Sequence, residues 1–138
     1  MFIDTSAFCA LTTPRDLHNQ TAKAIYKQFP KGKTAFYTSD YVLDEVYTLL
    51  KIRSNQAVAV KFMDRIAKSS LIVLRVADTI DEAAKAIFRQ YDDKRLSFTD
   101  CTSFALINEF NLDAVFAFDS HFNYHHYKHP VQVLGLIQ

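Results

Sequence analysis

The chain has 138 residues, a formal net charge of +1 at pH 7 and 49% hydrophobic residues, which excludes a largely disordered protein and indicates one domain over residues 1–138. The two cysteines form no C-x-x-C pair, which excludes the disulfide framework of small secreted proteins and favours the reducing cytoplasm. No apolar run approaches the ~18 residues of a membrane span, and no basic region followed by an apolar stretch opens the chain, so neither a membrane segment nor a signal peptide is expected.

Short apolar segments alternate with segments of helical periodicity along the chain. In order, we predict a strand at 1–4, a helix at 16–29, a strand at 34–37, helices at 40–53 and 56–68, a strand at 71–76, helices at 79–91 and 97–111, and strands at 114–118 and 131–136. Thr79-x-x-Glu82 and Ser97-x-x-Asp100 are read as capping boxes that open the last two helices. This alternation predicts an α/β fold with a mainly parallel sheet of about five strands flanked by helices.

Three aspartates stand alone in apolar or uncharged surroundings. Asp4 is the only charged residue between Met1 and Pro14, Asp100 is isolated within L-S-F-T-D-C-T-S-F, and Asp119 is isolated within A-V-F-A-F-D-S. Asp4 and Asp119 follow predicted parallel strands, whose carboxyl ends form the edge where ligands bind in α/β sheets. Each aspartate has a structural alternative as a helix or turn cap, and Asp100 has the strongest one because it belongs to the Ser97 capping box.

Glu45 is a fourth candidate, selected by helical geometry. At about 100° per residue, Glu45 lies at the flank of the apolar face formed by Val42, Val46 and Leu49, whereas Asp44 points toward solvent. A glutamate at the boundary of an ordinary amphipathic helix is the alternative interpretation.

Gathering four carboxylates in one pocket would be costly without a counter-charge. Two carboxylates 4 Å apart repel by about 4 kcal/mol at an effective dielectric constant of 20. A bound cation removes this cost, and oxygen-only ligands favour Mg²⁺ or Mn²⁺ over zinc. A competing zinc site would use the histidines near the C-terminus, namely His121, His125, His126 and His129. We disfavour it because Asn123, the adjacent tyrosines and Pro130 indicate a loop.

The ordered set of motifs resembles the PIN-domain nucleases, and within them the VapC-type toxins of toxin–antitoxin pairs. The matching pieces are F-I-D-T-S at the start, D-E-V around Glu45, S-F-T-D-C around Asp100 and F-A-F-D-S-H-F around Asp119. The order, the spacing and the overall length of the chain agree with this family, so the resemblance covers essentially the whole sequence.

The resemblance implies a PIN-like three-layer sandwich and a metal-dependent ribonuclease that leaves 5′-phosphate and 3′-hydroxyl ends. It assigns Asp4, Glu45, Asp100 and Asp119 as the catalytic, metal-binding acids, of which the fourth varies most within the family. It further gives Ser6 and Thr99 supporting roles beside the acids. It also implies a cognate antitoxin and a homodimer as partners, in addition to the RNA substrate.

Basic residues near the predicted site are candidate contacts for RNA phosphates. Lys94 and Arg95 precede the Asp100 helix. Six further cations could extend a basic surface or be ordinary solvated charges, namely Lys23, Lys27, Lys31, Lys33, Lys51 and Arg53. Three other functions remain open at this stage: an RNA-processing PIN nuclease without an antitoxin, a metal-dependent phosphatase with Asp4 as nucleophile, and a non-enzymatic binding module. The phosphatase is disfavoured because D-T-S lacks a second aspartate two residues after Asp4.

Overall fold

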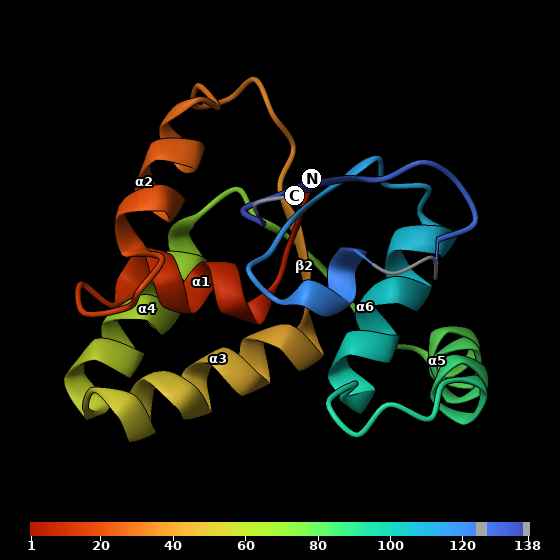
Figure 1. The fold of residues 1–138 in the computed structure, drawn as a ribbon. Coiled ribbons are helices and arrows are strands. Elements are labelled where there is room, and N and C mark those ends of the chain that lie inside the picture. The colour runs from red at the N-terminus through yellow and green to blue at the C-terminus, as the bar shows by residue number, and fades with distance from the viewer. Residues whose placement is uncertain (124–126, 137–138) are drawn as a thin grey trace.

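The computed structural model describes residues 1–123 and 127–136 of the chain (Figure 1). Its elements in chain order are β1 (Phe2–Ile3), α1 (Thr5–Thr12), α2 (Asn19–Lys27), β2 (Tyr37–Ser39), α3 (Asp40–Arg53), α4 (Gln56–Lys68), β3 (Ile72–Leu74), α5 (Asp78–Gln90), α6 (Phe98–Glu109), β4 (Ala114–Phe116), the 3₁₀ turn η1 (Ser120–Asn123) and β5 (Gln132–Leu134). None of the helices in the described part of the chain is long and apolar enough to cross a membrane.

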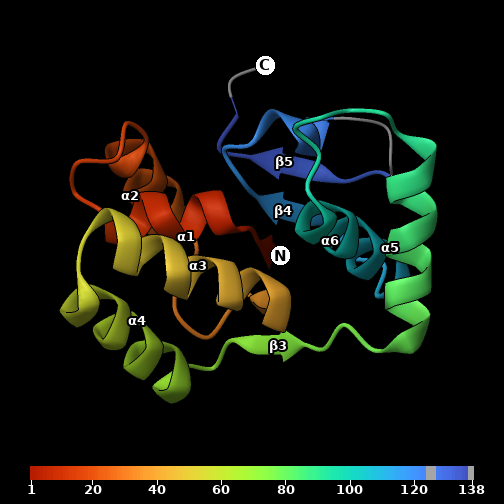
Figure 2. The same cartoon turned by 90° about the horizontal axis from the view of Figure 1, so that it is seen from below.

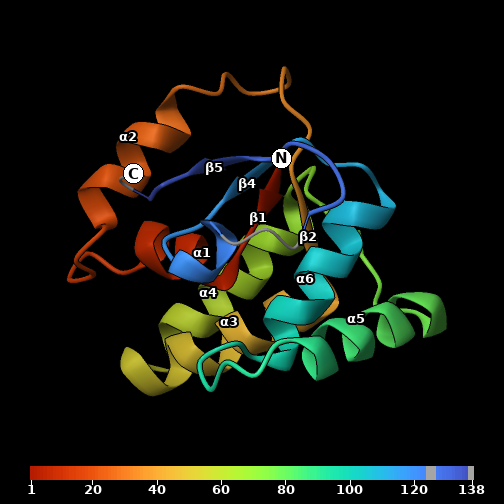
Figure 3. The same cartoon turned by 45° about the vertical axis from the view of Figure 1, so that its right-hand side comes forward.

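The described strands form one sheet in the order β3-β2-β1-β4-β5, and every neighbouring pair is parallel. Figure 3 shows β5, β4, β1 and β2 side by side in this order. The helices α1 to α4 lie on one side of the sheet and α5 and α6 on the other (Figure 2). This division follows from right-handed crossovers, because the chain moves outward from β1 to β3 and then crosses to β4 in the opposite direction. The predicted α/β three-layer sandwich with a parallel sheet is confirmed.

In the first two-thirds of the chain, some predicted elements have the observed bounds and others are shifted along the sequence. The helices α3 and α4 have the predicted bounds, 40–53 and 56–68. The strand predicted at 34–37 is wrong by up to three residues, because β2 includes Thr38 and Ser39. Both are polar and fully buried: the Thr38 hydroxyl donates to the carbonyl of Ile3 at 2.8 Å, and the Ser39 hydroxyl caps α3 by accepting from the Val42 N–H at 3.0 Å.

The helix α1 was not predicted, and one of the two capping boxes is wrong. Five of the eight residues of α1 are buried, so its sequence shows no polar face from which a helical period could be recognised. The helix α5 begins at Asp78 after Ala77 and has no side-chain cap, so Thr79 and Glu82 form no capping box. The Ser97 box is confirmed, since Ser97 and Asp100 exchange bonds at 3.0 and 3.2 Å.

The hydrophobic core continues across both faces of the sheet. The helix α6 is buried from Asp100 to Ile107, which places its N-terminal turn deep within the molecule. Because every strand is parallel, the carboxyl ends of β1 and β4 lie at the same edge of the sheet, beside the start of this helix. The fold therefore brings together chain segments that carry the isolated aspartates.

Candidate active site

A cavity of about 280 Å³ opens at this edge of the sheet, and all four predicted acids line it. Asp4 and Asp100 are buried, with 3% and 7% of their surface exposed, while Glu45 and Asp119 are half-buried. The acids come from four separate parts of the chain, and only the fold brings them to one place. We therefore call this cavity the acidic cleft.

Asp4 is held by its position between β1 and α1. Its carboxylate caps α1 by accepting the Ser6 N–H at 3.1 Å and also accepts the Ser6 hydroxyl at 2.6 Å. The Ser6 hydroxyl oxygen in turn accepts the N–H of Phe118 at 2.9 Å. Ser6 therefore fixes the orientation of Asp4 and links it to the segment that carries Asp119.

Burial makes the charged forms of two acids costly in the protein without a cation. Burial raises the pKa of Asp4 to about 6, although the hydrogen bonds from Ser6 oppose this shift. Burial, and then the neighbouring charges of Asp4 and Asp119, raise the pKa of Asp100 to about 7. The structure thus brings the acids close enough to repel one another, as the sequence suggested for a cation site.

Glu45 enters the cleft from α3, and the neighbouring Asp44 is exposed, as the helical geometry predicted. Burial raises the pKa of Glu45, whereas polar contact with the hydroxyls of Thr99 and Thr5 favours its charged form. Thr99 therefore lies beside an acid of the cleft, where the resemblance placed a supporting residue. The Thr5 hydroxyl has no hydrogen bond of normal geometry within the described residues and is buried.

Asp119 lies three residues after β4 and is in contact with His121. The imidazole Nδ1 of His121 is 2.6 Å from Oδ1 of Asp119 and 3.9 Å from Oδ2 of Asp100. Its Nε2 is 3.3 Å from Oδ2 of Asp93, in the segment between α5 and α6. Sequence reasoning considered His121 only for a separate zinc site, and the i, i+2 spacing of Asp119 and His121 was the signal available for its actual place.

The donor atoms of the cleft fit a divalent cation. Asp100, Asp119 and His121 each offer a ligand atom within 4.8 Å of the other two, and the carboxylates of Asp4 and Glu45 line the same cleft. The buried Thr5 hydroxyl also lines this cleft and makes no hydrogen bond of normal geometry within the described residues, so it could bond a further polar group in the cleft. Carboxylate oxygens, which are the majority of the donor atoms in the cleft, suit hard cations such as Mg²⁺ and Mn²⁺.

The other predicted contacts lie outside the cleft. His129 Nε2 is 2.6 Å from the carbonyl oxygen of Leu112, away from His121, and His125 and His126 lie outside the described residues. Lys94 and Arg95 are exposed and do not line the cleft. The basic residue that lines it is Arg53, at the end of α3, which the sequence offered only as one of several surface cations.

Comparisons with known proteins agree with this geometry. The PIN domain family model matches residues 1–125. The chain is 31% identical over 123 residues to the 23S rRNA-specific endonuclease VapC20 of Mycobacterium tuberculosis, which covers 89% of this chain and 92% of that protein. Among solved structures, that of M. tuberculosis VapC20, a sarcin–ricin loop cleaving toxin, matches with a TM-score of 0.81 at 30% identity and covers 88% of this chain and 92% of that one.

A second solved structure is similar in fold alone. A toxin–antitoxin complex from Klebsiella pneumoniae matches with a TM-score of 0.64 at 17% identity, covering 95% of this chain and 98% of that one. The resemblance inferred from the ordered acidic motifs is confirmed by the family match and by the identity to VapC20 over most of the chain. The chain therefore belongs to the PIN-domain family.

Proposed function

We propose that this PIN-domain protein is a metal-dependent endoribonuclease and the toxin of a toxin–antitoxin pair. The observation that carries the proposal is the convergence of Asp4, Glu45, Asp100 and Asp119 on one cleft of about 280 Å³. The 31% identity to VapC20 supports an RNA substrate, and ribosomal RNA is the first substrate to test. We assign the four acids as metal ligands, with Ser6 and Thr99 supporting Asp4 and Glu45.

The residues of the cleft have distinct tasks in the hydrolysis of a phosphodiester. Asp4, Glu45, Asp100 and Asp119 would hold a Mg²⁺ or Mn²⁺ ion, which would supply a water molecule of lowered pKa and neutralise charge on the phosphate. Asp4 and Asp100 must be deprotonated to hold a cation, and their pKa values of about 6 and about 7 make deprotonation harder than for ordinary carboxylates when no cation is bound. Ser6 keeps the Asp4 carboxylate directed into the cleft, and His121 does the same for Asp119.

The identity of the target rests on the relative. VapC20 is described as a 23S rRNA-specific endonuclease and as a sarcin–ricin loop cleaving toxin. We propose the same loop of ribosomal RNA as the substrate of this protein. We further propose that this toxin is a homodimer and that an antitoxin covers its acidic cleft. Both proteins would lie in the cytoplasm, where ribosomes are found. We also treat residues 1–138 as one nuclease domain.

Purified protein tests the central claim directly. A synthetic RNA hairpin with the sarcin–ricin loop is incubated with Mg²⁺ or Mn²⁺ and analysed on a denaturing gel. Cleavage should stop with EDTA and with Asp4→Asn, while Asp44→Asn, at an exposed position beside Glu45, should cleave normally. Undiminished cleavage by Asp4→Asn would refute the assignment. Release of inorganic phosphate from small phosphoesters without RNA cleavage would favour the phosphatase instead.

A further inference from the structure

A stacked pair of aromatic rings lines the acidic cleft beside the acids. His18 and Phe118 have ring centroids 4.5 Å apart and an interplanar angle of 10°, and both residues line the cleft. Each is half-buried, so the stack is neither part of the closed core nor fully exposed. Phe118 is the residue immediately before Asp119, which places the stack next to a proposed metal ligand.

Both rings are held in place by the backbone around them. The His18 N–H donates to Oδ1 of Asp16 at 2.8 Å, and the next residue, Asn19, donates from Nδ2 to the carbonyl of Ala10 at 2.7 Å. Phe118 is held by the bond from its N–H to Ser6 and contacts Phe116, with ring centroids 5.9 Å apart. Buried Asn19, the first residue of α2, thus ties the end of this loop to α1, so the stack is not the sole contact that anchors the loop.

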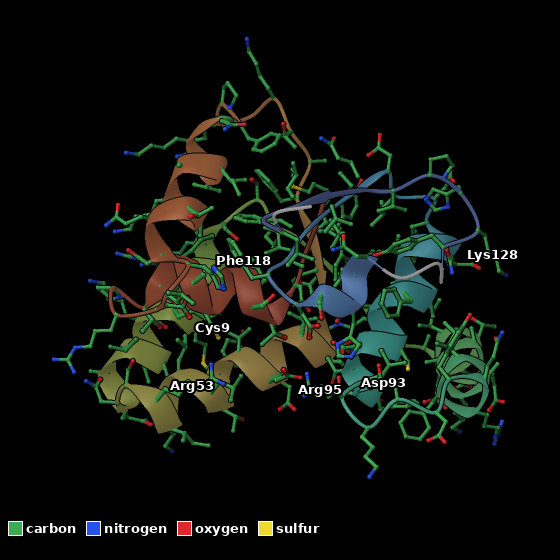
Figure 4. The ribbon with its side chains drawn as sticks, viewed as in Figure 1. Cys9, Arg53, Asp93, Arg95, Phe118 and Lys128 are labelled. Atoms are coloured by element: carbon green, nitrogen blue, oxygen red, sulfur yellow. The ribbon has the colours of Figure 1, made fainter. Side chains whose placement is uncertain are left out.

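A cation faces the same cleft. The guanidinium-bearing Arg53 lines it, and Arg53 has no ion pair within 4.0 Å among the described residues. Its charge favours the ionised forms of Cys9 and Glu45, so it lies within electrostatic reach of the cleft interior. Figure 4 labels three residues that line the cleft, Arg53, Cys9 and Phe118, and shows them toward α1 and α3, with Asp93 below α6.

We propose that the His18–Phe118 stack receives one unpaired RNA base beside the cleaved bond and that Arg53 contacts a neighbouring phosphate. This inference rests on the proposed function and specifies its substrate as RNA with an unstacked nucleotide. Bases in loops can leave the RNA stack and lie on aromatic side chains, whereas bases within a duplex cannot. The base stacks on the His18 ring, and the backbone that follows it passes the acids.

The test compares His18→Ala with His18→Phe, which retains an aromatic ring, and with Leu17→Ala. Leu17 is the neighbouring residue, is 90% exposed and does not line the cleft. Steady-state cleavage of the sarcin–ricin hairpin with Mn²⁺ should give a KM about tenfold higher for His18→Ala, with kcat within about twofold. His18→Phe should restore the KM, and Leu17→Ala should leave it unchanged. An unchanged KM in His18→Ala, or a loss confined to kcat, overturns the proposal.

A binding measurement separates this inference from the proposed activity. In the Asp100→Asn background, hairpins carrying 2-aminopurine at single loop positions should lose fluorescence at one position on binding, and His18→Ala should abolish that loss. This result supports the stack even if the wild-type protein cleaves no RNA, in which case only the proposed function fails. Absence of quenching at every loop position overturns the stack.

The contact with Arg53 has its own measurement. Binding of the same hairpin is followed over a range of salt concentrations, and the slope of log Kd against log salt should fall by about 0.7 in Arg53→Gln, the value for one single-strand phosphate. Lys51→Gln, at an exposed position on the same helix that does not line the cleft, is the control and should leave the slope unchanged. An unaltered slope in Arg53→Gln overturns the phosphate contact.

Discussion

His121 connects an acid of the cleft to the segment between α5 and α6: its Nδ1 is 2.6 Å from Asp119, and its Nε2 is 3.3 Å from Asp93. Only 6% of the His121 surface is exposed, so the imidazole is shielded from bulk water, whereas the side chains of Asp119 and Asp93 are partly exposed. Asp119 itself lies beyond the end of β4, where no strand pairing restrains it. The histidine therefore supplies the restraint that the sheet does not.

Replacing His121 should weaken cation binding. We expect His121→Ala to lower Mn²⁺ affinity or cleavage rate by about 10–100-fold, as is usual when a partner of a metal ligand is removed. His121→Asn should lose less, because its amide can still donate to Asp119. Calorimetric titration with Mn²⁺ measures the change, and His129→Asn serves as control because His129 contacts Leu112 and does not line the cleft. Equal affinities in all four proteins would contradict this role.

Two adjacent residues of α3 should differ sharply in importance. Glu45 lines the cleft and Asp44 is exposed, so Glu45→Gln should abolish most cleavage while Asp44→Asn should leave it unchanged. Each substitution removes one negative charge from the same helix, which makes the pair a matched comparison. Cleavage rates at saturating Mn²⁺ provide the measurement. Similar losses in both variants would indicate a general charge effect rather than a metal ligand.

The metal-free protein should become less stable as the pH rises. The pKa of Asp4 is raised to about 6 and that of Asp100 to about 7, so between pH 4 and 7 the folded protein binds more protons than the unfolded chain. The stabilisation is complete below the unfolded pKa of about 3.9 and is lost as pH rises through the folded values. Urea unfolding in EDTA should therefore give a smaller unfolding free energy at pH 8 than at pH 5. Mn²⁺ should restore stability at pH 8, and Asp100→Asn should flatten the dependence.

Cation binding should release protons near neutral pH. Because Asp100 has a pKa of about 7 without a cation, binding at pH 6.5 must displace a proton from a partly protonated site. Calorimetry in two buffers with different ionisation enthalpies should therefore give different apparent heats at pH 6.5 and similar heats at pH 8.5. Identical apparent heats in the two buffers at pH 6.5 would contradict the raised pKa of Asp100.

Loss of the Ser6 hydroxyl should reduce both stability and activity. Ser6→Ala leaves the N–H of half-buried Phe118 without its acceptor and removes a 2.6 Å bond to Asp4, so we expect a loss of about 1–3 kcal/mol in unfolding free energy. Ser69→Ala removes an exposed hydroxyl that donates to the carbonyl of Ile66 at 2.8 Å and accepts the Leu71 N–H at 3.3 Å. Both of these bonds are exposed to water, so this substitution should cost less. Chemical denaturation measures both. Equal losses of unfolding free energy in Ser6→Ala and Ser69→Ala would mean that Ser6 does not connect Asp4 to the segment that carries Asp119.

Local sequence information was sufficient for much of the fold and for the acids. The helices α3 and α4 were predicted at their observed bounds because each shows a clear apolar period and a polar cap, Ser39 or Asn55. For Asp4 and Asp100 the capping and cleft interpretations are compatible: each caps a helix and lines the cleft at once. A residue at a helix start beside a parallel sheet edge can serve both roles, so capping was no argument against the site.

Contacts between distant segments were out of reach of the sequence. The bond of the Ser6 hydroxyl with Phe118 spans 112 residues, and the His18–Phe118 stack joins a loop after α1 to the end of β4. The helix α1 was missed because burial around its circumference removes the period that sequence reading depends on. Lys94 and Arg95 were chosen for closeness in sequence to Asp100, yet Arg53 is the cation that lines the cleft.

Gly135 constrains the cleft from the far end of the chain. Its φ is +111°, and a Cβ atom there would lie 2.4 Å from the carbonyl oxygen of Ala117 and 3.2 Å from a ring carbon of Phe118. Any side chain at this position must push the wall that carries Asp119. Random mutagenesis screens for inactive protein should therefore recover changes just after β5 alongside changes in the acids. Inactive variants at Gly135 would be explained by displacement of the segment that carries Asp119. They should not be taken as evidence for additional metal ligands.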